Sequence, residues 1–288
     1  MKNILYIILI SILCIYTSNI YAQTDYQYIR DSIFQKASKI PNDTARLKYL
    51  ETNSNFYQNT PIALDICYKL KDEAIRQKNV RSQYYASEIL AFLYLQNYDN
   101  KKLEEEIKNL KKYSQKLNSY SGYIKGLNYN VILNIYQENY NSALLYLKEL
   151  EYIANKYNHN RGKILLANDY YSFYISTGEN EKAYKYIKEA TSLINDKTPL
   201  DIYINVYSNI IYYLTFIKDF DNVYKYNTEF DKKIQQFYAN NPKKKLLISP
   251  TICKIELNYF YYFLEKENYN LCQEHLDKAK STISSPYW

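Results

Sequence analysis

The hydrophobic positions of this chain recur with a regular period. Each copy of the repeated pattern has a small or apolar residue, and two further small or apolar residues follow it four and seven positions later. This spacing places the three residues on one face of an α-helix. The period is 40, because the first five copies begin at Ala63, Leu103, Ala143, Ala183 and Val223. Only Asn227 breaks the apolar character of this face, and a sixth copy begins at Cys272 after a longer interval. The pattern therefore predicts a helix repeated six times.

Other apolar stretches lie between these helices, at residues 81–96, 123–137, 162–176 and 203–217, and short polar turns join the two kinds of segment. Turns this short make sequential helices antiparallel neighbours. A single hairpin cannot bury both apolar faces, whereas stacked hairpins bury a continuous core. The predicted fold is all-α, an α-α superhelix of about six helical hairpins with period 40, and its repeat domain spans residues 42–288.

The composition supports helices rather than strands. The chain has only four glycines and six prolines, which disfavours a fold with many β-turns. It also has 38 tyrosines. A side chain with an apolar ring and a polar tip suits half-buried seams between helices. The joint excess of Tyr, Asn, Ile and Lys is equally explained by AT-rich coding, which carries no functional meaning.

The N-terminus has the pattern of a secretory signal peptide. Lys2 precedes 13 apolar residues, Ile4 to Tyr16, and Ala22 ends a plausible cleavage site; the apolar run is short for a membrane span. We predict a signal peptide at residues 1–22, cleavage near Ala22-Gln23, and a secreted or periplasmic protein. A membrane anchor is the alternative. Residues 23–41 are predicted to form an N-terminal capping helix.

After cleavage the chain offers little for a membrane or a nucleic acid. No later segment has 18 uninterrupted apolar residues, so no stable membrane span is expected. Loss of Lys2 leaves 36 Lys and Arg against 30 Asp and Glu. A net charge of +6 spread along the chain marks no nucleic-acid surface, so no direct nucleic-acid partner is predicted.

The repeat resembles the tetratricopeptide-repeat superfamily. Residues 178–190, GENEKAYKYIKEA, match the second-helix pattern of that family: a turn, then Ala183, Ile187 and Ala190. Tyr174 falls on the aromatic position of the first helix. The period of 40 rather than 34 predicts helices longer by about a turn. Where the family has a small first-helix residue, this chain has Ala91 once but otherwise Val131, Tyr171 and Ile211, which predicts altered packing of the first helices.

A narrower resemblance is to exported tetratricopeptide proteins of Bacteroides-type bacteria, including sensor halves of membrane-bound transcription regulators. It rests on the signal peptide, on residues 40–51, IPNDTARLKYLE, and on the Tyr-rich, Gly-poor repeats. In that group a transmembrane helix, a coiled coil and a DNA-binding domain follow the array. The sequence ends before such segments, so the resemblance implies a sensor module without its cytoplasmic half.

The sequence predicts no enzyme, cofactor or metal site. Its two histidines, His159 and His275, lie in no glycine-containing nucleophile elbow. The four glycines allow no phosphate-binding loop, and no Cys-x-x-Cys pair is present. In the last hairpin, Cys253 and Cys272 are offset by roughly 15 Å along the helix axes, too far for a disulfide.

The family resemblance implies that first helices line a concave groove that binds a peptide or protein. Counted back from the repeat alanine, two sets of positions face this groove: Asn128, Asn168 and Ser208, and Ile132, Ser172, Tyr212 and Tyr261. Asn128 and Asn168 are one repeat apart, and a ladder of amides can hydrogen-bond an extended peptide backbone. The alternative is that asparagine is simply abundant in this chain.

Two functional hypotheses follow. The first is a non-enzymatic, exported helical-repeat scaffold that binds a protein or peptide. The alternative is a glycan-binding surface protein that stacks tyrosines on sugar rings, motivated by Tyr84-Tyr85, Tyr170-Tyr171 and residues 259–262. The helix at residues 269–285 also has a wide apolar stripe with little sequence after it. Tyr287 and Trp288 cover this stripe, or the C-terminal hairpin self-associates, or the natural protein continues.

Overall fold

The computed structural model describes residues 22–241 and 245–283, which form thirteen α-helices and no strand. This all-helical architecture confirms the predicted fold class. The predicted signal peptide, apart from Ala22, lies outside the described residues, and so do Tyr287 and Trp288. The chain divides into two compact units, one of residues 70–230 and one that combines residues 1–69 with residues 231–288. Each unit is described separately.

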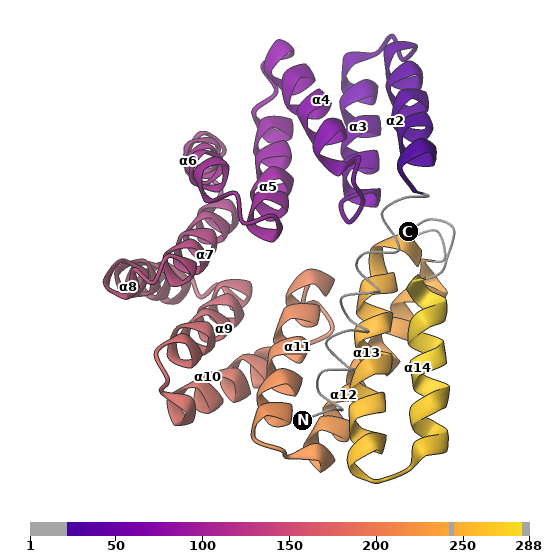
Figure 1. Ribbon diagram of the computed structural model, residues 1–288. Helices are drawn as coiled ribbons and strands as arrows, with labels where there is room; N and C mark the ends of the chain where they lie inside the picture. The colour runs from indigo at the N-terminus through magenta and orange to yellow at the C-terminus, as the bar shows by residue number, and fades with distance from the viewer. Residues whose placement is uncertain (1–21, 242–244, 284–288) are drawn as a thin grey trace. The chain divides into compact units, whose positions relative to one another are not determined.

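The unit of residues 70–230 is a stack of helical hairpins. Its first helices are α5 (Val80–Gln96), α7 (Tyr120–Tyr136), α9 (Asn160–Ser176) and α11 (Leu200–Phe216). Its second helices are α6 (Asn100–Lys116), α8 (Tyr140–Lys156), α10 (Asn180–Leu193) and the start of α12 (Phe220–Asn240), while the unit begins within α4 (Ala63–Arg76). In each series the helices begin one full period apart, as predicted. Figure 1 shows the first helices on the inner side of this unit and α6, α8 and α10 on its outer side.

The predicted apolar face of the second helices is buried throughout the unit. Leu103, Ala143 and Ala183 have no exposed surface, and Val223 has almost none. Asn227, the polar exception in the pattern, is fully buried as well. The register that the sequence predicted is therefore the register of the hairpin seams.

Most turns between successive helices of this unit share one geometry; the longer connection between α10 and α11 is the exception. The middle residue of each short turn has a positive φ, as at Tyr98, Asn118, Glu138, Asn158, Gly178 and Lys218. At the first of these turns, Asp99 N donates to Tyr94 O at 3.0 Å, which ends α5 in a Schellman motif. The Asp99 side chain then accepts from Lys102 N at 3.2 Å and begins α6. One short turn thus ends a helix and caps the next, which sets the hairpin geometry.

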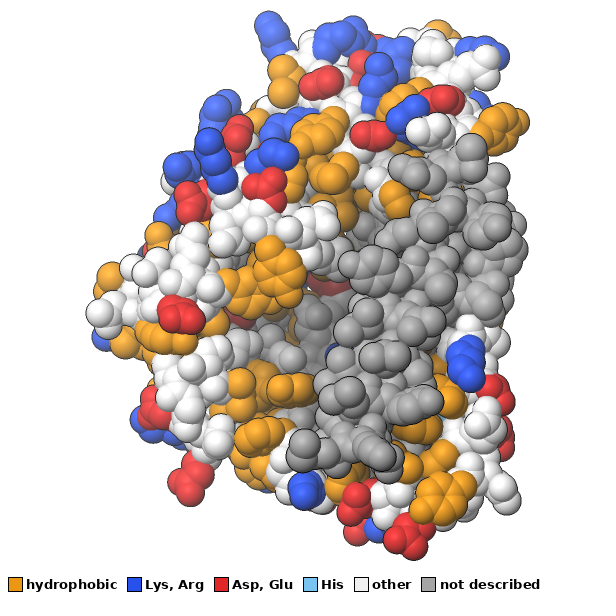
Figure 2. Space-filling view, in the orientation of Figure 1, with side chains coloured by type: hydrophobic (Ala, Val, Ile, Leu, Met, Phe, Trp, Pro, Cys, Tyr) orange, Lys and Arg blue, Asp and Glu red, His pale blue; other side chains and the backbone are white. Residues whose placement is uncertain are grey.

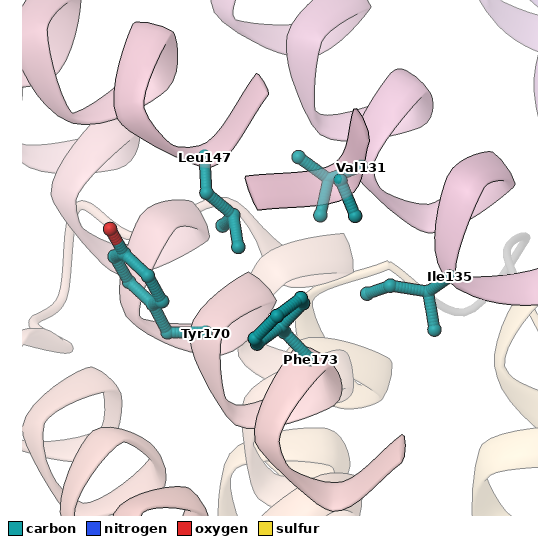
Figure 3. Close-up of a cluster of buried hydrophobic side chains, with 6 residues drawn as sticks. Val131, Ile135, Leu147, Tyr170 and Phe173 are labelled. Atoms are coloured by element: carbon teal, nitrogen blue, oxygen red, sulfur yellow. The ribbon is translucent and has the colours of Figure 1, made fainter. Parts of the chain in front are cut away.

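The core of this unit joins helices of successive hairpins. Val131 and Ile135 of α7, Leu147 of α8, and Tyr170 and Phe173 of α9 converge in one buried cluster (Figure 3). A hairpin alone would expose these side chains to water, so the cluster stabilises the stack by the hydrophobic effect.

Tyrosines occupy the seams between first and second helices. The Tyr123 hydroxyl donates to Glu149 Oε1 at 2.5 Å, and the Tyr170 hydroxyl donates to Glu151 Oε2 at 3.2 Å. Burial and the neighbouring carboxylate raise the pKa of Tyr123 to about 12. The rings pack against apolar neighbours while the hydroxyls find acceptors at the rim, which confirms the structural role predicted for part of the tyrosine excess.

The second unit contains α2 (Ala22–Ser38), α3 (Asp43–Phe56), α13 (Lys245–Glu265) and α14 (Tyr269–Ile283). The helix predicted for residues 23–41 is α2, and it packs on α3. α13 and α14 form the last hairpin, in which Cys272 and Ala279 are buried. Cys67 is buried as well, and the absence of a disulfide between Cys253 and Cys272 stays a prediction.

None of the helices within the described ranges combines the length and the apolar character that a membrane span requires.

Two glycines of α7 differ in the space around them, and they are expected to respond oppositely to alanine. A Cβ on Gly122 would lie 2.6 Å from Ser114 Oγ and 2.9 Å from the Tyr84 ring, whereas a Cβ on Gly126 would meet nothing closer than 3.9 Å. We expect Gly122→Ala to lower the free energy of unfolding by about 1–3 kcal/mol through overpacking. We expect Gly126→Ala to raise it by about 0.5–1 kcal/mol. Urea unfolding of both variants measures this, and equal effects would contradict the close helix packing at Gly122.

Candidate functional site

Six of the seven predicted groove residues lie on first helices of the unit of residues 70–230. Asn128 and Ile132 are on α7, Asn168 and Ser172 are on α9, and Ser208 and Tyr212 are on α11. The seventh residue, Tyr261, lies on α13 in the other unit, so it is described apart from them; it is partly exposed.

The amide ladder predicted from Asn128 and Asn168 exists, but it joins successive first helices. Asn128 Nδ2 donates to both carboxylate oxygens of Asp169, at 2.7 and 2.9 Å. One repeat later, Asn209 Nδ2 donates to Asn168 Oδ1 at 2.8 Å. Both predicted asparagines are buried. These amides therefore hold α7 to α9 and α9 to α11, and the partners in each pair are separated by one repeat plus one residue.

The two predicted serines are also withdrawn from the surface to different degrees. Ser208 is buried, and Ser172 is half-buried with its hydroxyl donating to Asn168 O at 3.2 Å. Tyr212 differs, because 62 % of it is exposed. Among the six predicted residues of this unit, Tyr212 is the one with a large and mostly exposed side chain, whereas Ile132 is half-buried.

Tyr212 belongs to a larger set of residues, which we name the first-helix row. The row consists of the residue equivalent to Tyr212 in each first helix and the residue one helical turn later. Its members are Phe92 and Gln96, Ile132 and Tyr136, Ser172 and Ser176, and Tyr212 and Phe216. All are exposed or half-buried, and Tyr136, Tyr212 and Phe216 are 52, 62 and 60 % exposed. The positions one turn after the predicted residues were not recognised from the sequence, although they recur with the same period as the rest of the repeat.

Charged side chains link the first helices near their N-terminal halves. Lys125 Nζ of α7 lies 3.4 Å from Asp201 Oδ2 of α11 and 3.9 Å from Glu88 Oε1 of α5. Arg161 of α9 reaches the same Asp201 oxygen at 3.8 Å. Lys125 is largely buried. The network spans 76 residues of sequence between Lys125 and Asp201, so α5, α7, α9 and α11 share one inner face.

Asp169 is the most unusual ionisable group on this face. It is fully buried, and burial raises its pKa to about 8, although the hydrogen bond from Asn128 and the charge of Lys125 act in the opposite direction. Loss of hydration disfavours the charged carboxylate. Burial therefore favours the protonated form of this carboxyl group, and its hydrogen bonds with Asn128 join α7 and α9.

The two histidines have structural partners. His159 caps α9, because its Nδ1 accepts from Gly162 N at 3.0 Å, and burial together with Arg161 lowers its pKa. His275 Nδ1 lies 2.7 Å from Glu256 Oε2, and its ring contacts Tyr259 and Phe263. Within the described residues, no group of three or more His, Cys, Asp or Glu could hold a metal ion.

Comparison with known proteins gave no relative. No protein-family model matches the chain, and no curated protein matches it. The tightly packed array of helical hairpins is consistent with a tetratricopeptide-like solenoid.

Proposed function

We propose that this protein is a non-enzymatic helical-repeat scaffold that binds a protein or peptide through the first-helix row. The observation that carries the proposal is the exposure of large apolar side chains at Tyr136, Tyr212 and Phe216 on helices whose other faces are buried. Aromatic residues supply much of the binding energy of protein interfaces. A row with a period of one hairpin offers one contact for each repeat along an extended ligand.

The buried polar groups beneath the row support a rigid binding surface. The Asn128–Asp169 and Asn168–Asn209 hydrogen bonds fix the spacing of successive first helices. A preorganised surface loses less conformational entropy when it binds a ligand. The predicted amides thus act as supports of the surface rather than as direct contacts to a peptide.

The cellular setting is a second part of the proposal. The N-terminal pattern at residues 1–22 supports export to the periplasm or the exterior. The resemblance to exported tetratricopeptide proteins of Bacteroides-type bacteria supports a role as a sensor module that reports binding to other components. In this setting the ligand would be a periplasmic or secreted protein or peptide.

Affinity capture with a double variant tests the proposal. Tyr212→Ser/Phe216→Ser gives α11 the residues that α9 carries at Ser172 and Ser176, so the fold should tolerate it. We expect the tagged protein to retain a discrete set of partners, and the double variant to retain at least about tenfold less, as loss of aromatic hot spots implies. Tyr224→Ser on α12 is the control and should retain them. Equal capture by all three proteins would contradict binding through the row.

Most of the tyrosines that motivated the glycan-binding alternative are buried or half-buried, whereas Tyr261 is exposed. Tyr170, Tyr171 and Tyr259 are buried, and Tyr84 is sufficiently buried to have a raised pKa. Rings inside helix seams cannot stack on a sugar. Protein or peptide binding therefore remains the proposal.

A further inference from the structure

The outer face of α8 differs from those of the other second helices. The regular register of the repeat allows solvent-facing positions to be compared from one second helix to the next. Leu145 and Tyr152 of α8 are 67 and 61 % exposed. The positions equivalent to Leu145 hold Glu105, Lys185 and Lys225, and those equivalent to Tyr152 include Lys112 and Ser192, all exposed or half-buried.

The fold gives no reason for apolar side chains at these two positions. The other repeats place charged or polar residues there with the same helix geometry and the same buried face. Leu145 and Tyr152 are two helical turns apart, so they lie on one face about 10 Å apart along the axis. Exposed apolar surface that is bordered by polar residues is a common feature of interaction sites.

The stripe continues into an aromatic cluster at the C-terminal end of α8. The rings of Tyr120 and Tyr157 stack with centroids 3.7 Å apart. Lys156 Nζ lies 5.4 Å from the ring centroids of both Tyr152 and Tyr157. We name Leu145, Tyr152, Tyr157 and Tyr120 the α8 patch. Leu145 and Tyr152 lie on α8, Tyr157 follows the end of α8, and Tyr120 begins α7, and none of the four belongs to the first-helix row.

Lysines are frequent on α8 and on the nearby helix α6. Lys148 and Lys156 are on α8, and Lys108, Lys112 and Lys116 are on α6, where blue side chains gather in Figure 2. The two helices adjoin, because Lys111 Nζ lies 4.0 Å from Glu149 Oε1. In the part of the chain that the structure describes, none of these five lysines forms an ion pair, and the contacts of Lys156 are tyrosines. Lys148 and Lys156 therefore lie without an ion pair on the same helix as Leu145 and Tyr152, while Glu149 of α8 pairs with Lys111 and Glu151 accepts from the Tyr170 hydroxyl.

This combination of charge and apolar surface selects the class of partner. Two copies of the chain that met through the α8 patch would bring their lysines together, and like charges disfavour such a contact. A continuous anionic surface, such as an anionic membrane, would also come close to the exposed acidic residues Glu104 and Glu105 of α6. Like charges would repel each other there. A short segment with carboxylates beside a few apolar side chains avoids both conflicts.

We propose that the α8 patch docks an acidic amphipathic segment of a partner protein. Apolar side chains about two helical turns apart on that segment contact Leu145 and Tyr152, and flanking carboxylates pair with the lysines of α6 and α8. The surface is a second binding site on the outer side of the array, and it does not depend on binding through the first-helix row.

The test uses fluorescence anisotropy with the purified protein and two labelled synthetic helical peptides. One peptide has leucines two helical turns apart flanked by glutamates, and the other has lysines in place of the glutamates. We expect the protein to bind the acidic peptide, with an affinity that falls as salt rises. Leu145→Lys/Tyr152→Ser, which introduces the residues of α10, should weaken binding at least about tenfold, although it adds positive charge. Lys185→Ala/Ser192→Ala on α10 is the control and should bind as the unaltered protein does.

Several results would overturn the proposal. The first is that Leu145→Lys/Tyr152→Ser, with an unchanged circular dichroism spectrum, binds the acidic peptide as tightly as the unaltered protein does. The second is that the unaltered protein binds the lysine peptide as tightly as it binds the acidic peptide. Binding of phosphatidylserine vesicles without binding of the acidic peptide would assign the patch to membranes. Concentration-dependent dimers in sedimentation that the variant abolishes would assign it to self-association.

Discussion

Replacing Ala183 by aspartate is expected to unfold the hairpin stack. Ala183 has no exposed surface and lies on the buried face of α10. An aspartate at this position would place an unpaired charge in a hairpin seam, at a cost of several kcal/mol. Because the stability of a domain is about 5–15 kcal/mol, the loss approaches the whole stability of the unit. Ala143→Asp, at the equivalent position of α8, should have the same effect.

Thermal unfolding followed by far-UV circular dichroism measures this loss. Lys185→Asp is the matched control: it is two residues away on the same helix and its side chain is exposed, so a change of about 0.5 kcal/mol is expected. Equal melting temperatures for Ala183→Asp and Lys185→Asp would refute the register.

Asp169→Asn is expected to stabilise the protein, and to do so more at pH 8 than at pH 5. The folded state holds the Asp169 proton up to a pKa of about 8, whereas the unfolded chain releases it near its ordinary value of 3.8. Unfolding therefore releases a proton between these values, and stability falls as pH rises through this window. Asparagine has no proton to release in this range, so the variant does not lose stability in this way. At pH 8 its free energy of unfolding should exceed that of the unaltered protein by on the order of a few kcal/mol.

The neighbouring repeat shows that asparagine fits at this position. Asn209 is the residue equivalent to Asp169, and it forms its hydrogen bond with Asn168. Urea unfolding at both pH values is the measurement. Asp201→Asn is the control: this carboxylate is exposed and pairs with Lys125 and Arg161, so its removal should cost less than about 1 kcal/mol without a gain at pH 8. If Asp169→Asn is no more stable than the unaltered protein at pH 8, Asp169 does not carry the proton proposed for it.

The hairpin register was predictable because the second helices are strongly amphipathic. Leu103, Ala143 and Ala183 are followed by charged and polar residues between the apolar positions, so one face stands out in the sequence, and burial follows that face. The first helices are buried on most sides. Their apolar residues therefore show no single face, and the sequence located them as stretches between the second helices.

The role of Asn128 and Asn168 could not be derived from their spacing. A shared period indicates that each occupies the same place in its repeat, but it does not tell whether the side chain faces a ligand or the next helix. The structure decides this through Asp169 and Asn209, which complete the pairs. Asp169 and Asn209 are also one period apart. The sequence therefore contains two sets of polar residues with the same period, and this was the feature that could have indicated a contact between repeats.

The turn geometry was predicted only in outline. The polar turns were located, but the left-handed residues Tyr98, Glu138 and Lys218 are of types that seldom adopt positive φ. Gly178, by contrast, has the residue type most typical of that conformation. At turns without glycine the hydrogen bonds of the Schellman motif and the packing of both helices impose the conformation, and neither is visible in local residue preferences.

Photo-cross-linking from Tyr212 tests whether this protein binds its partner through the first-helix row. A benzoylphenylalanine would replace either Tyr212 of the row or Lys225 on the outer face of α12, in cells that naturally make the protein. We predict that the photoreactive residue at position 212 forms a covalent adduct with a discrete protein, and that an excess of this protein without the photoreactive residue prevents the adduct. The photoreactive residue at position 225 should not form this adduct. No adduct from position 212, or the same adducts from both positions, would contradict the account.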